Sequence, residues 1–149
     1  MRAHIDVSGT VRIAAPPADA FRFFTPEGEK LWVAGWQPEY LHPWDGALQE
    51  GLTFRTRHGG EETLWLVSRL DGMTAVDYVR VTPGSRLGTV SVRFAASGAA
   101  ASDVGVTYRL TSLAPAADAT VETFARRFPE YLATWERSIN ALVGAAHEH

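Results

Sequence analysis

A chain of 149 residues, of which 46% are hydrophobic and 21% charged, is long enough to bury one core and has the composition of a globular domain. A net charge of −3 gives no basic surface for nucleic acid, and the absence of cysteine excludes disulfides, thiolate metal sites and a cysteine nucleophile. No stretch is apolar and long enough to span a membrane or to serve as a secretory signal, so we expect a cytoplasmic protein.

The first predicted elements are a strand and a short helix. Apolar and polar residues alternate from residue 5 to residue 13, which predicts a strand with one buried face. The pair Pro16-Pro17 ends this strand. Residues 19–24 then predict a short helix that buries Phe21 and Phe24.

The next segment, 25–46, is rich in aromatic residues. Trp32, Trp36, Tyr40 and Trp44 recur at every fourth position, but two prolines and a glycine between them interrupt any regular helix. We expect an irregular segment that closes the mouth of a cavity, with Trp36 or Tyr40 in contact with it. The alternative is simple core packing by large rings.

Residues 51–113 predict a run of antiparallel strands, because the turn dipeptides Gly59-Gly60, Asp71-Gly72 and Pro83-Gly84 divide it at regular intervals. The predicted strands are 51–58, 62–70, 74–82, 86–95 and 104–113. From Asp118 onward, apolar residues at spacings of three and four predict a long amphipathic helix. This helix is the only long element able to cover one face of the sheet.

The order of these elements resembles the helix-grip fold of the START-like, or SRPBCC, superfamily, which includes polyketide cyclases and dehydrases and lipid-transfer domains. The resemblance rests on three stretches: VRIAAPPADAFRFF, YVRVTPGSRLGTVSVRF and FARRFPEYLATWERSINAL. It implies a single α+β domain over residues 1–149, with a curved six-stranded antiparallel sheet wrapped around the C-terminal helix. Two short helices are expected between strands 1 and 2, and a cavity between the sheet and the last helix.

Strand parity predicts which side chains line this cavity. If the turns at Asp71-Gly72 and Pro83-Gly84 close even-numbered loops, one face of the strands is apolar and the other, with Trp65, Tyr78 and Arg80, faces solvent. The expected lining residues, besides Trp36 and Tyr40, are Phe54, Leu64, Leu66, Val79, Val90, Val92, Phe94 and, from the helix, Trp135.

Asp77, Tyr108 and His58 are the candidate catalytic residues. Asp77 shares the parity of Val79 and would point inward as a polar anchor or acid–base group, beside the Tyr108 phenol. The alternative for Asp77 is an ion pair with an arginine, and a register slip of one residue would move it outside and bring Tyr78 and Arg80 into the cavity. If a three-residue loop follows His58, this residue could form a proton-transferring pair with Glu62 at the cavity rim, or it could simply be an exposed turn residue.

Three functions are compatible with these residues. The first is binding of a small, largely hydrophobic or lipid-like molecule in the cavity. The second, which the resemblance implies, is a cyclase or dehydratase that needs no cofactor and no metal, with Asp77 or His58 as base and Tyr108 as acid. The third is a protein-interaction module of the heat-shock-ATPase-activator type, or a homodimer, with Trp65 and Tyr78 as contact residues on the outer face.

Overall fold

The computed structural model describes residues 1–147 and consists of one antiparallel sheet and three α-helices within that range. In chain order its elements are β1 (His4–Ile13), α1 (Pro17–Arg22), α2 (Pro26–Glu29), β2 (Glu39–His42), β3 (Thr53–His58), β4 (Glu61–Asp71), β5 (Ala75–Thr82), β6 (Arg86–Ala96), β7 (Ser102–Ser112), a 3-10 turn (Pro115–Ala117) and α3 (Asp118–His147). The predicted α+β class, with a long C-terminal helix against an antiparallel sheet, is confirmed.

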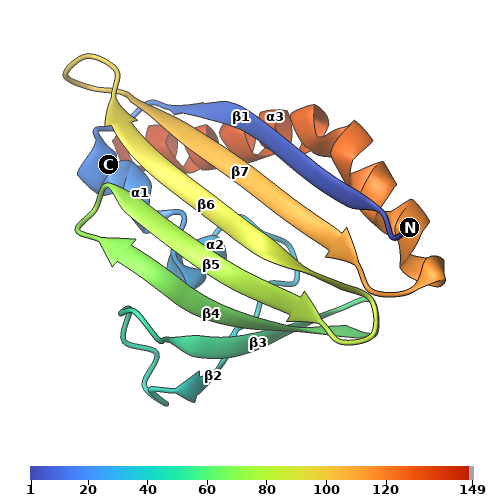
Figure 1. The fold of residues 1–149 in the computed structure, drawn as a ribbon. Coiled ribbons are helices and arrows are strands. Elements are labelled where there is room, and N and C mark those ends of the chain that lie inside the picture. Colours follow the sequence, from blue (N-terminus) through green and yellow to red (C-terminus); the bar gives the residue numbers. More distant parts are fainter. Residues whose placement is uncertain (148–149) are drawn as a thin grey trace.

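The sheet has seven strands in the order β1-β7-β6-β5-β4-β3-β2, and the helices lie on one face of it (Figure 1). The expected number of six strands is therefore wrong by one. The additional strand, β2, lies inside the aromatic segment and pairs with β3, where Tyr40 is opposite Phe54. Its four residues are too few to produce a visible alternation, so periodicity could not predict it.

Helix α3 lies against β1, and polar contacts hold the two together. The backbone N–H groups of Arg12 and Ala14 donate to Glu136 (2.7 Å) and Asn140 (2.9 Å), respectively. At Gly9 a Cβ atom would lie 2.3 Å from a methyl group of Leu132, so the glycine allows this close approach. None of the helices within residues 1–147 is both long and apolar enough to cross a membrane.

Three hairpin loops differ in length from the prediction. The loop after Asp71 has three residues, 72–74, but a bulge between Val67 and Arg69 compensates for it, so the other two loops determine the register. Gly59 and Gly60 both have positive φ and form a two-residue loop, so His58 pairs with Glu61. Pro83 and Gly84 (φ 73°) occupy the positions that favour a type II turn, which the Ser85 N–H closes on the Thr82 carbonyl (2.9 Å). Ser85 makes this a three-residue loop.

Because of the loops after His58 and Thr82, β4 and β5 present to α3 the face that was predicted to be the outer one. Trp65, Tyr78 and Arg80 lie on the inner face, toward α3, and not on the outer face. The expectation for Leu64, Leu66 and Val79 is wrong, because a shift of one residue reverses the face of every side chain. Leu66, for example, is 39% exposed, whereas Tyr78 is 6% exposed.

Candidate functional site

An inner cavity of about 190 Å³ lies between the sheet and α3. Aromatic rings from four parts of the chain form most of its wall: the segment after α2, the β3–β4 hairpin, the strands β5 and β7, and α3. Its lining residues are Phe24, Glu29, Trp32, Val33, Trp36, Phe54, Trp65, Tyr78, Arg80, Val90, Val92, Val106, Tyr108 and Trp135.

Two of these rings, the indoles of Trp32 and Trp36, come from the aromatic segment, and hydrogen bonds hold both of them in place. The indole N–H of Trp32 donates to the Phe23 carbonyl and that of Trp36 to the Pro26 carbonyl, each at 2.8 Å. Both indoles are thereby oriented toward the sheet by backbone groups of the preceding helices. Trp44, by contrast, is 86% exposed, so the regular spacing of four does not correspond to one surface.

The rings in the wall pack mainly edge to face. Phe54 stacks on Trp65 with a centroid distance of 5.8 Å, and Trp36 meets Trp65 edge-on at 5.6 Å. On the helix side, Trp135 contacts Trp32 at 5.8 Å. Such packing holds each ring in place, so the cavity is shaped by rigid groups with few rotatable bonds.

A larger outer pocket of about 650 Å³ adjoins the inner cavity. Val33, Trp36, Trp65 and Arg80 belong to the walls of both. The remaining wall of the outer pocket is more polar, with Thr56, Arg57, His58, Glu61, Thr63, Arg86, Thr120, Thr123 and Tyr131 among its residues. The four shared residues therefore form the boundary between an aromatic chamber and a polar one.

Among residues 1–147, Glu29 is the one carboxyl group in the wall of the inner cavity. Glu29 keeps some solvent-accessible area, but its side chain lines the aromatic cavity. The surrounding protein atoms therefore determine how easily its carboxyl group ionises. Burial raises the pKa of Glu29 from 4.5 to about 8. Near neutral pH this group is a protonated acid able to donate a hydrogen bond or a proton.

Two phenols face the same cavity. The Tyr78 hydroxyl donates to the Phe24 carbonyl (2.9 Å), and burial raises its pKa well above the ordinary range. Burial also raises the pKa of Tyr108 to about 12, with the Arg80 charge opposing and Glu29 adding to the effect. Tyr108 packs against Phe124 of α3 at 4.9 Å, and its hydroxyl has no hydrogen-bond partner among residues 1–147.

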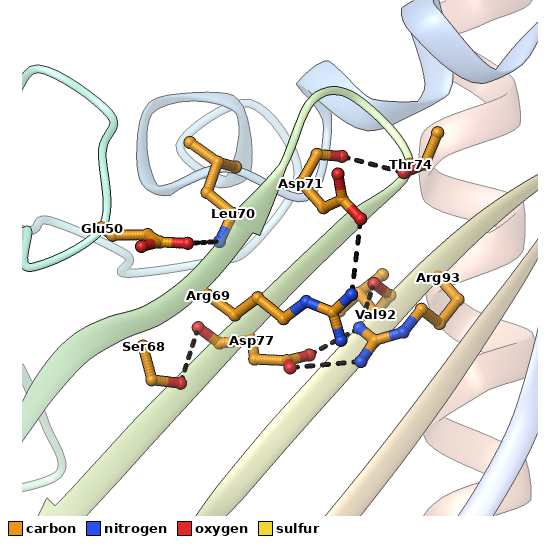
Figure 2. Close-up of polar contacts among 9 residues, drawn as sticks. All are labelled: Glu50, Ser68, Arg69, Leu70, Asp71, Thr74, Asp77, Val92 and Arg93. Carbon is orange, nitrogen blue, oxygen red and sulfur yellow. Dashed lines mark hydrogen bonds and ion pairs between the residues drawn. The ribbon is translucent and has the colours of Figure 1, made fainter.

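Asp77 does not point into the cavity, and this expectation is wrong. It lies on the outer face of β5, where its carboxylate accepts hydrogen bonds from Arg93 at 2.5 and 3.1 Å (Figure 2). Partial burial opposes ionisation, but the Arg93 guanidinium outweighs it and holds the pKa of Asp77 below its ordinary value. The register shift caused by Ser85 places it there, as an exposed ion pair.

The other predicted residues do not gather at one place. Tyr108 is on the wall of the inner cavity, as are Trp36, Phe54, Val90, Val92 and Trp135. His58 is exposed at the rim of the outer pocket, opposite Glu61 rather than Glu62. The structure therefore does not bring Asp77, His58 and Tyr108 together at one position.

Tyr40 and Phe94 are structural neighbours of the cavity and not part of its described wall. Tyr40 packs on Phe54 at 6.2 Å, and its hydroxyl donates to Glu27. Phe94 lies on the inner face but packs under α1, against Phe21 at 5.2 Å and Phe24 at 5.6 Å. That the residues in the wall bind a ligand stays a prediction.

Sequence reasoning missed Glu29, and it placed Arg80 in the cavity only under the alternative register. Glu29 lies at the end of a four-residue helix whose Thr25 cap accepts from the Gly28 N–H (3.0 Å), and TPEGE is a recognisable helix start. That signal could have predicted the helix but not the direction of the carboxyl. A loop of three residues at Pro83-Gly84, instead of an even number, would have placed Arg80 on the inner face. No group of three or more potential metal ligands converges within residues 1–147.

Comparison with known proteins shows likeness at the level of the fold. No family model and no curated protein sequence matches the chain. Among solved structures, norcoclaurine synthase from Thalictrum flavum in complex with dopamine and hydroxybenzaldehyde has a TM-score of 0.67 at 14% identity, covering 95% of this chain and 87% of that one. An Hsp90 activator from Plasmodium falciparum has a TM-score of 0.65 at 15% identity over 94% and 96% of the two chains.

CalU16 from Micromonospora echinospora is similar in the same way, with a TM-score of 0.61 and 16% identity over 93% of this chain and 84% of that one. These comparisons show that the chain has the same fold as these proteins, which is the helix-grip fold expected from the sequence. At such identities the likeness concerns the fold, so the function must be argued from the cavity itself.

Proposed function

We propose that this protein binds a small, largely aromatic molecule in the inner cavity. The observation that carries the proposal is the cavity wall, in which eight aromatic rings from the described residues surround a volume of about 190 Å³ between sheet and helix. The wall residues belonging to this set are Phe24, Trp32, Trp36, Phe54, Trp65, Tyr78, Tyr108 and Trp135. Solved structures of this fold include one that holds dopamine and hydroxybenzaldehyde, both aromatic.

The interaction-module alternative loses its expected contact residues. Trp65 and Tyr78, which would have formed the outer surface of such a module or of a homodimer, lie inside the aromatic wall. A cavity also remains between the sheet and α3, whereas large side chains filling it would have favoured the module. Ligand binding is therefore the better-supported function.

The neutral dye N-phenyl-1-naphthylamine tests the proposal, because its fluorescence increases when an apolar site binds it. We expect wild-type binding, and an affinity at least about tenfold weaker in Val90→Phe, since the added ring occupies the cavity. Val79→Phe is the matched control: Val79 is on the outer face of the adjacent strand, opposite Thr89. Equal loss in both variants, or no wild-type binding, would contradict the proposal.

Acid–base catalysis on the bound molecule is a second candidate function, supported by Glu29. In its ionised form this carboxylate could remove a proton from a carbon next to a carbonyl group, while the electron pair moves to the carbonyl oxygen and the Tyr108 hydroxyl donates to it. Return of a solvent proton restores the ketone, so no cofactor is needed.

Deuterium exchange into the methyl group of 2-acetonaphthone measures this reaction by NMR in D₂O. We expect exchange that wild-type protein accelerates, with a rate that rises with pH through about 8 as Glu29 ionises. Glu29→Gln is expected to abolish the acceleration while keeping N-phenyl-1-naphthylamine binding. Exchange that proceeds equally with both proteins would exclude Glu29 as the base.

A further inference from the structure

Arg80 differs from the other arginines around the two chambers in having no carboxylate partner. Arg57 pairs with Glu62 at 3.5 Å and Arg86 with Glu61 at 3.1 Å. Among residues 1–147, no aspartate or glutamate oxygen lies within 4.0 Å of the Arg80 guanidinium. Glu61 acts on Arg80 only as a more distant charge. The guanidinium that the two chambers share therefore has no contacting carboxylate within residues 1–147.

The hydrogen-bonding capacity of Arg80 is also largely unused. One terminal nitrogen contacts the Thr82 hydroxyl at 3.4 Å, and the buried Nε–H has no hydrogen-bond partner among residues 1–147. The guanidinium lies over the Trp65 ring, 4.8 Å from its centroid, which fixes its plane. Burial lowers the pKa of Arg80, yet an arginine remains charged under such conditions. A buried positive charge with unused hydrogen-bond donors favours the binding of an anion.

Neighbouring groups make this position suitable for an oxygen acid. Arg80 belongs to the walls of both chambers, and Tyr108 is close enough for each to perturb the pKa of the other. Within the described part of the chain the Tyr108 hydroxyl makes no hydrogen bond, so it can donate to a ligand. Glu29 does not compensate the charge of Arg80, because its carboxyl group is protonated near neutral pH.

We propose that the ligand is an aromatic carboxylate whose ring system lies in the inner cavity and whose carboxylate binds Arg80 and the Tyr108 hydroxyl at the boundary with the outer pocket. This inference rests on the proposed binding function and specifies the chemical class of its ligand. A carboxylate suits the site because the planar guanidinium can donate two parallel hydrogen bonds to its two oxygens. A neutral aromatic molecule would leave the buried charge unpaired.

The matched probes 2-naphthoate and 2-naphthamide test the inference by calorimetry with the full chain at pH 7. They have the same ring system and nearly the same shape, but only naphthoate is charged. We expect wild-type protein to bind naphthoate at least about tenfold more tightly than naphthamide. The ring system contributes equally to the binding of both probes, whereas only naphthoate also pairs with the buried charge of Arg80.

Substitution of Arg80 should remove the preference for naphthoate over naphthamide and leave the cavity intact. We expect Arg80→Met to bind the two probes within about twofold of each other, with naphthamide affinity retained. Arg80→Lys keeps the charge but not the planar donor pair, so part of the preference should remain. Arg109→Met is the control for overall charge, since Arg109 is exposed on the outer face and pairs with Asp6 at 3.1 Å.

Each outcome supports or overturns the inference. Equal wild-type affinities for the two probes, a preference that survives in Arg80→Met, or its loss in Arg109→Met would overturn it. Binding of N-phenyl-1-naphthylamine without naphthoate binding would overturn the carboxylate inference and leave the proposed function standing. Failure of all three probes to bind would overturn both.

Discussion

Replacing Glu29 with glutamine is expected to stabilise the protein at pH 8 and to change its stability little at pH 5. The pKa of Glu29 is about 8 in the folded protein and near 4.5 when the chain unfolds. Between these values the folded state retains a proton that the unfolded state releases. The free energy of unfolding of the wild type therefore falls as the pH rises through this window.

The full shift corresponds to about 5 kcal/mol at most. Because Glu29 keeps some accessible area, we expect the difference between Glu29→Gln and wild type to grow by about 2–3 kcal/mol from pH 5 to pH 8. Urea unfolding at several pH values measures it. Tyr78, Tyr108 and Arg80 share the cavity but keep their protonation state over this range. A difference that does not vary with pH would show that the carboxyl ionises normally.

Phe54→Ala is expected to lower the free energy of unfolding by about 3–5 kcal/mol. Phe54 is 1% exposed and lies at the centre of the aromatic wall, where it contacts Trp36, Trp65 and Tyr78. Its removal leaves a void that rigid neighbouring rings cannot fill, so both the transfer free energy and the packing are lost. Urea unfolding monitored by circular dichroism measures the effect.

Leu66→Ala provides the comparison for Phe54→Ala. Leu66 is on the outer face of β4 and is 39% exposed, so we expect a loss of less than about 1 kcal/mol. The two residues would have shared one inner face under the register predicted from the turns. Similar losses at both positions would contradict the register of β3 and β4 in the structure.

Much of the fold could be predicted from local patterns. The predicted strand 62–70 corresponds to β4 (Glu61–Asp71), and the helix expected from Asp118 onward corresponds to α3. Alternation with a period of two and repetition at three and four residues are properties of the chain itself and need no knowledge of neighbours. The sequence also predicted part of the cavity wall on β6 and β7, namely Val90, Val92 and Tyr108.

The faces of β4 and β5 could not be predicted with the same means. Apolar residues occur on both sides of these strands: Leu64 and Val79 on one, Trp65 and Tyr78 on the other. With no contrast between the faces, a hairpin loop longer by a single residue, Ser85, decided which side met α3. That difference moved Asp77 outward.

The sequence by itself determined the order and type of the main elements, the helix-grip arrangement and the concentration of aromatic residues after the first strand. Only the tertiary structure decided which polar groups enter the cavity. Glu29 lies in an irregular segment, where no periodicity orients side chains, and the missing partner of Arg80 is a property of its surroundings. The physical reason is that orientation and pairing depend on residues distant in the chain, whereas secondary structure depends largely on residues nearby.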